Sequence, residues 1–135
     1  MTLASACETG VFDTAVGSAE QLGFAAAFLT AGARSVVRTL WPVNDLASAL
    51  LMFRALTLEA EQGVGFLEAL ALGVDGLRQA SGADVAANLR ALACIAAGES
   101  ALDGIEAAAK QLGTRTDAPF AHPVFWAGVV VSGAG

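Results

Sequence analysis

Cys7 is the residue whose type and position could most directly carry chemistry. Residues 3–6 indicate the end of a short buried strand, and the thiol follows at once. From residue 7 to residue 17 the chain is polar and contains glycines, and Ser18 can then cap a helix. A thiol at the mouth of a parallel sheet, near the amino end of a helix, meets backbone N–H groups that lower its pKa and hold an oxyanion. Cys7 is therefore a candidate nucleophile; the alternative is a small hydrophobic residue that fills the strand end.

A second strand is expected to bring Asp45 to the same place. Residues 34–41 contain three β-branched residues and are followed by Pro42, which predicts a strand that ends there. Strand, helix and strand over the first 41 residues form a βαβ unit, and such crossovers are nearly always right-handed and parallel. Cys7 and the turn at residues 42–45 then lie together at the carboxyl ends of two strands, the edge where open α/β sheets bind ligands.

The remaining chain predicts mostly helices. Asn44 or Asp45 can cap a helix over residues 46–62 that ends at Gly63, and a further helix follows at residues 66–80. Two alanine-rich helices are expected at residues 84–97 and 102–112. A final strand is expected at residues 124–132. The pattern predicts a single α/β domain.

Composition excludes several classes of function. The 135 residues carry a net charge of −6, and the seven basic residues are scattered, so nucleic acid is not an expected partner. The mean hydropathy is high, at +0.62, yet no run of about 20 apolar residues suggests a membrane span. No secretory leader is recognisable, and two cysteines make no disulfide scaffold, so the cytoplasm is the expected location. With one histidine and no phosphate-binding loop, neither a metal nor another cofactor is expected.

Four blocks of sequence follow one another in an order typical of one family. They are SACETG at residues 5–10, FLTAGARSVV at 28–37, LWPVND at 40–45 and HPVFWAGVV at 122–130. The chain resembles the CHAT domain, a family of caspase-like cysteine peptidases related to separases, with the hallmark runs LSACETG, AFL-x-AGARSVV, LWPV-x-D and HP-x-x-WA-x-F-V. The agreement extends from end to end and is weakest between about residues 82 and 116.

The resemblance implies a fold and a set of roles. The fold would be the C-terminal part of a caspase-like, three-layer α/β/α domain whose small sheet is mainly parallel and flanked by helices. Cys7 matches the nucleophile that attacks a peptide carbonyl once a histidine has taken its proton. Asp45 matches the acidic position that favours a basic side chain before the scissile bond by charge pairing. The alternative for Asp45 is a helix N-cap.

One part of the family pattern has no counterpart. The general base of the family lies in a histidine-glycine motif on an earlier strand, and only six residues precede Cys7. Residues 1–135 are therefore expected to be the C-terminal portion of a CHAT domain, inactive on their own, whose partners are a protein or peptide substrate and the missing N-terminal part. The alternative is a non-catalytic, peptidase-like interaction module in which Cys7 is a relic.

Four other residues could take part in chemistry, and a structural role is expected for each. His122 follows Cys7 in the order of papain-like enzymes, but the sequence typical of those enzymes around the cysteine is absent. Cys94 has helical spacing to Leu89 and Leu92, which predicts a core or half-buried position. Trp41 and Trp126 border strands and are expected to pack against the core.

Overall fold

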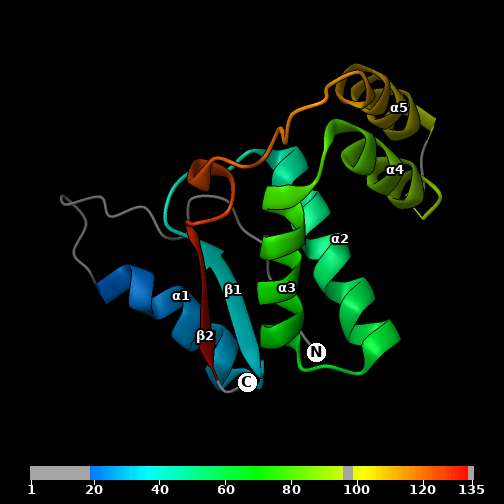
Figure 1. Ribbon diagram of the computed structural model, residues 1–135. Coiled ribbons are helices and arrows are strands. Elements are labelled where there is room, and N and C mark those ends of the chain that lie inside the picture. Colours follow the sequence, from blue (N-terminus) through cyan, green and yellow to red (C-terminus); the bar gives the residue numbers. More distant parts are fainter. Residues whose placement is uncertain (1–18, 96–98, 134–135) are drawn as a thin grey trace.

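The computed structural model describes residues 19–95 and 99–133, which form a mixed, helix-rich α/β domain with a small sheet (Figure 1). Figure 1 shows the sheet between α1 on one side and the α2–α3 pair on the other, with the α4–α5 pair beyond α2 and α3. The elements in chain order are α1 (Ala19–Thr30), β1 (Ser35–Thr39), α2 (Asp45–Gln62), α3 (Phe66–Gln79), α4 (Gly82–Ala93), α5 (Glu99–Gly113), the short 3-10 helix η1 (Pro123–Phe125) and β2 (Val129–Gly133).

The sheet joins the middle of the chain to its end. β1 and β2 pair antiparallel, with Ser35 opposite Gly133 and Thr39 opposite Val129. The expected parallel partner of β1, residues 3–6, lies outside the described residues, so the mainly parallel sheet stays a prediction. The last strand begins at Val129 rather than at residue 124, because residues 123–125 instead form η1 behind a proline that starts a helical turn.

The α2–α3 hairpin forms the centre of the core. The Asn44 side chain accepts a hydrogen bond from the Ala47 backbone N–H at 3.0 Å, which caps α2. Gly63 ends the helix in the left-handed conformation, at φ 67°, which residues other than glycine rarely adopt. Leu51 is fully buried, and Gly73 of α3 comes so close that a Cβ atom there would lie 3.2 Å from the Leu51 Cδ1 atom. The two helices thus approach over small residues.

The α4–α5 hairpin is a second packed unit. Leu89 of α4 is fully buried, and Ala109 of α5 belongs to the same hydrophobic cluster. α4 begins two residues earlier than expected, because Ser81 caps it. The segment after α5 then crosses the start of α4, where the Gly82 N–H donates to the Asp117 carbonyl oxygen at 3.2 Å. Phe120 is buried in the main core and meets Phe125 edge-on at 5.1 Å, which anchors the return to β2.

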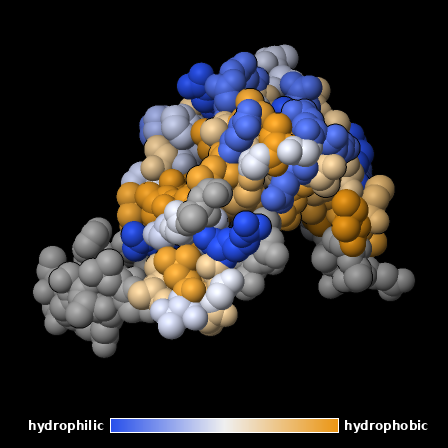
Figure 2. All heavy atoms as spheres, turned by 90° about the horizontal axis from the view of Figure 1, so that it is seen from below, coloured by the Kyte–Doolittle hydropathy of each residue, from blue (hydrophilic) through white to orange (hydrophobic). Residues whose placement is uncertain are grey.

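The surface is mixed in character. Figure 2 shows hydrophobic areas next to hydrophilic ones on the face seen from below. The large hydrophobic residues that remain exposed come from several elements: Leu56, Leu67, Leu72, Ile95, Leu102 and Val124. Among the helices in the described parts of the chain, none is both long enough and apolar enough to cross a bilayer.

The start of α4 predicts a dependence of stability on pH. The Asp84 carboxylate accepts hydrogen bonds from the Ser81 hydroxyl at 2.6 Å and from the Ser81 N–H at 2.9 Å, and these hydrogen bonds lower the pKa of Asp84 below 3.8. A carboxyl group whose pKa is lower in the folded state stabilises the fold above its unfolded pKa. This stabilisation is lost as the pH falls through the folded pKa. We therefore expect Asp84→Asn to flatten the acid limb of a plot of urea midpoint against pH below about pH 4.

A matched substitution controls for the loss of a carboxylate. Asp103 of α5 is exposed and lies outside the capping box. Asp103→Asn is expected to leave the acid limb unchanged. Equal flattening by both variants would contradict the assignment of the effect to the capping box.

Candidate active-site edge

The candidate site lies where β1 ends and α2 begins, at residues 40–45. The Leu40 N–H donates to the Gly128 carbonyl oxygen at 2.8 Å, which continues the pairing of β1 one residue beyond the strand. Pro42 then ends the extended segment, and the turn leads directly to the cap of α2 at Asn44. This edge therefore joins two of the sequence blocks, 40–45 and 122–130, in space.

Asp45 lies at the first position of α2 and its side chain is exposed. Asn44 rather than Asp45 is the N-cap of α2, so the capping role considered for Asp45 belongs to its neighbour. Within the described residues, the Asp45 carboxylate has no hydrogen bond or ion pair. A carboxylate in the first helical turn is also favourably placed against the helix dipole. Asp45 is thus held at the edge with its charge exposed to solvent.

Trp41 packs against the C-terminal segment at residues 124–128 and holds this turn next to it. Its indole N–H donates to the Val124 carbonyl oxygen at 3.0 Å. Its ring lies against Gly128, where a Cβ atom would come within 2.7 Å of the indole atom Cε2. The contact requires glycine at position 128, because any side chain would overlap the ring. Trp41 therefore packs against the segment before β2 and not within the hydrophobic core cluster, and it links the turn that carries Asp45 to that segment.

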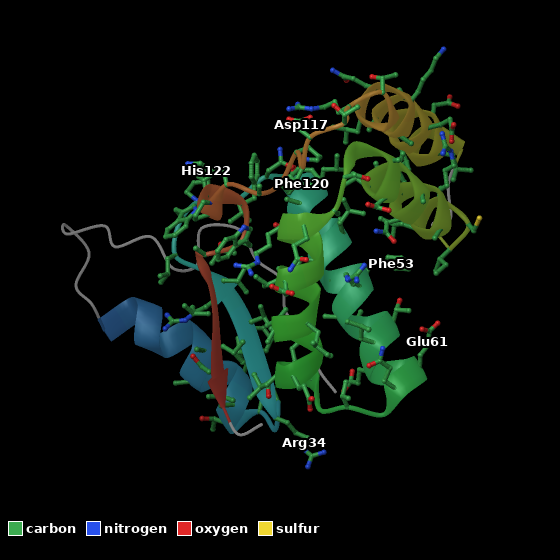
Figure 3. All side chains as sticks on the ribbon, viewed as in Figure 1. Arg34, Phe53, Glu61, Asp117, Phe120 and His122 are labelled. Carbon is green, nitrogen blue, oxygen red and sulfur yellow. The ribbon has the colours of Figure 1, made fainter. Side chains whose placement is uncertain are left out.

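His122 has a local structural contact. Its side chain caps η1, with Nδ1 accepting from the Val124 N–H at 3.2 Å, and the ring is exposed. Figure 3 shows His122 and Phe120 on the segment that runs from α5 to β2, near the ends of the strands. Because Nδ1 accepts a hydrogen bond in this arrangement, the neutral ring carries its proton on Nε2. Cys7, with which His122 would pair in a papain-like arrangement, lies outside the described residues.

The prediction for Cys94 was wrong. Its thiol is exposed and free, at the C-cap of α4. Five residues separate it from Leu89, which is about 140° around a helix, so the two cannot share one face. The helix also ends at Ala93, short of the expected residue 97, and Ile95 beyond it is 72% exposed. Cys94 therefore does not lie on the buried face of α4, although Leu92 is only two residues away.

Two polar residues near this edge were not predicted from the sequence. Arg38 Nε and Thr39 Oγ1 are buried without hydrogen-bond partners in the described structure. Both residues line a cavity of about 20 Å³ between β1 and α2, together with Ser48. The available signal was a polar pair in a strand that otherwise consists of β-branched residues and serine. Arg38 and Thr39 are the last residues of β1, so they place polar groups close to the turn that carries Asp45.

The small sheet flanked by helices defines a mixed, helix-rich α/β domain. The CHAT domain family matches residues 2–134, and the chain belongs to the CHAT domain family. Searches of curated proteins and of solved structures gave no match.

Proposed function

We propose that this chain is the C-terminal part of a CHAT-type cysteine endopeptidase, with Cys7 as the nucleophile and Asp45 as the contact for a basic side chain. The observation that carries the proposal is the family match over residues 2–134, which includes the SACETG and LWPVND blocks. The caspase-like, three-layer fold with a mainly parallel sheet is part of the proposal. It is supported by the position of the sheet between α1 and the α2–α3 pair (Figure 1).

The proposed reaction is acyl transfer from a peptide to Cys7 and then to water. A base takes the thiol proton, the sulfur attacks the peptide carbonyl, and the C–N bond breaks as the base returns the proton to the leaving amine. Water then cleaves the thioester and regenerates the thiol. The only histidine of the 135 residues is His122, whose Nδ1 caps η1, so the base must come from another segment. The isolated chain is therefore inactive in this proposal.

Asp45 supplies the specificity in this proposal. Its carboxylate is exposed at the end of β1, and Asn44 performs the capping that would otherwise occupy it. A hydrogen bond between charged groups contributes about 1.5–3 kcal/mol, which corresponds to about 10- to 150-fold in specificity. The substrate is accordingly a protein or peptide with arginine or lysine before the scissile bond. A reducing compartment such as the cytoplasm suits a free catalytic thiol.

Peptide cleavage tests the proposal. We expect the isolated chain to show no Cys7-dependent cleavage of an arginine peptide. Joined to a CHAT N-terminal segment with its histidine-glycine motif, the chain should cleave that peptide. Cys7→Ala should abolish the activity, whereas Cys94→Ser, the matched change at the exposed thiol, should retain it. Asp45→Asn should lower the preference for arginine over its neutral isostere citrulline by about 10-fold or more.

Three outcomes would contradict parts of this proposal. Cleavage that survives Cys7→Ala would exclude Cys7 as the nucleophile. An unchanged arginine-to-citrulline ratio in Asp45→Asn would exclude Asp45 as the contact for the basic side chain. A joined chain that binds the peptide and never cleaves it would favour the non-catalytic interaction module.

A further inference from the structure

We propose that a groove between α2 and α4 binds an acidic side chain of a peptide segment, with Arg54 as the residue that anchors its carboxylate. Two adjoining hollows, of about 380 and 240 Å³, form this groove and share Arg54 and Asn88. The larger hollow extends towards the end of α3, and the smaller one runs along α2 past Phe53 and Leu58. Figure 3 shows Phe53 and Glu61 on the side of α2 turned away from the sheet.

Arg54 has no ion pair or hydrogen bond within the described residues, although the Asp84 carboxylate lies near enough to interact with its charge. Its guanidinium lies against the backbone of α3 at Gly76, where a Cβ atom would come within 2.6 Å of the terminal nitrogen Nη2. Its Nε is buried and has no hydrogen-bond partner, and no ion pair within the described residues includes Arg54. Because Nε is buried against α3 while Arg54 lines both hollows, a carboxylate in the groove would pair with the terminal N–H groups of the guanidinium.

The other arginines of the helical part differ from Arg54 in this respect. Arg78, Arg90 and Arg115 each pair with a carboxylate, and the side chains of all three are about half exposed. Asp84 lines the same hollow as Arg54, but its carboxylate accepts two hydrogen bonds from Ser81. The carboxylate that shares the hollow with Arg54 therefore directs its hydrogen bonds to Ser81 and interacts with Arg54 only through its charge.

The lining of the groove indicates which carboxylate it accepts. A guanidinium presents a fork of donors that matches a carboxylate, and the half-buried Asn88 amide beside it adds a further donor. Asp84 and Glu61 line opposite parts of the groove, and their negative charges disfavour a ligand that carries two neighbouring carboxylates. Phe53 and Leu58 offer apolar contact on one side. The best fit is a single glutamate or aspartate with an apolar neighbour.

The groove is separate from the edge that carries Asp45. Arg54 follows Asp45 by nine residues, which is about 13 Å along the helix and about 180° around it. A peptide bound at Arg54 therefore occupies the opposite face of α2. The proposal thus adds an acidic recognition site to the basic preference proposed for Asp45, and it stands whether or not the chain is a peptidase.

Peptide titrations followed by NMR test the proposal. The probes are acetyl-Leu-Glu-Gly-amide, its glutamine counterpart, and succinate. We expect the glutamate peptide to bind about 10-fold or more tightly than the glutamine peptide and to shift the Arg54 Nε–H and Asn88 side-chain amide signals. Arg54→Gln should abolish both effects. Arg78→Gln, the matched loss of charge on α3, should change the dissociation constant less than twofold.

Further outcomes decide each part of the assignment. Equal binding of the glutamate and glutamine peptides, or unchanged binding in an Arg54→Gln variant with a native circular dichroism spectrum, would overturn the site. Succinate binding as tightly as the glutamate peptide would overturn the peptide as its ligand. Arg54→Lys should bind the glutamate peptide about 10-fold more weakly, since the ammonium lacks the fork; wild-type binding by this variant would overturn the role of the guanidinium.

Discussion

Leu51→Ala is expected to lower the free energy of unfolding by about 3 kcal/mol, within the range of about 2–5 kcal/mol found for buried leucines. Leu51 is fully buried on α2, against Gly73 of α3, and it lines the small cavity beneath β1. Removing its branched end opens a cavity where both helices and the sheet meet. Urea denaturation followed by circular dichroism measures the change, which is a large share of the total stability of a domain of this size.

Leu56→Ala is the matched control for this prediction. Leu56 lies on the same helix, five residues further on, and 38% of its surface is exposed. Truncating it removes the same atoms from a site that solvent already reaches, so we expect a loss below about 1 kcal/mol. Equal losses in the two variants would contradict the packing of α2 against α3 and the sheet.

The helices that could be predicted from the sequence are those with strong local end signals. The helix expected at residues 46–62 is α2, which begins one residue earlier, at Asp45. Asn44 marks its start by side-chain capping, and Gly63 marks its end by the left-handed conformation. The helix expected at 66–80 is α3, Phe66–Gln79. Local side-chain chemistry marks the ends of α2, whereas α3 begins after Gly65 without a side-chain cap.

The elements that were misplaced depend on contacts between distant parts of the chain. The last strand begins at Val129 because the segment before it forms η1 and meets Trp41, 83 residues earlier in the chain. Cys94 was placed in the core because the expected helix was too long and its face was extrapolated through a helix end. The first error arises because a single sequence does not show that this segment packs against Trp41. The second is a misplaced helix end, and with it a misplaced buried face.

The candidate site was predicted in one part and not tested in the other. The turn that carries Asp45 lies at the end of β1, as expected from the proline after the strand. The sequence left Asn44 and Asp45 as alternative caps, because both side chains can accept a backbone N–H. Only the backbone geometry distinguishes them, and it assigns the cap to Asn44. Cys7 lies outside the described residues, so its position beside this turn stays a prediction.

Gly128→Ala is expected to destabilise the domain by about 2 kcal/mol and to displace the Trp41 ring. Gly128 is buried, and a Cβ atom there would come within 2.7 Å of the indole, which its hydrogen bond to Val124 holds in place. The ring must move or the backbone of β2 must shift. Urea denaturation measures the loss, and fluorescence in a Trp126→Phe background, where Trp41 is the remaining tryptophan, reports the displacement as a red shift.

Two further variants separate steric overlap from a general effect of replacing glycine. A Cβ atom at Gly104, within α5, would meet nothing within 4 Å, so Gly104→Ala should stabilise the protein by about 0.5–1 kcal/mol through helix propensity. Trp41→Ala leaves room for the new methyl group, so in that background Gly128→Ala should cost about 1 kcal/mol less than in the wild type. Additive losses in the double variant would contradict the contact. Coupling would show that the indole, together with the hydrogen bond from Leu40 to Gly128, holds the end of the chain against the turn that carries Asp45.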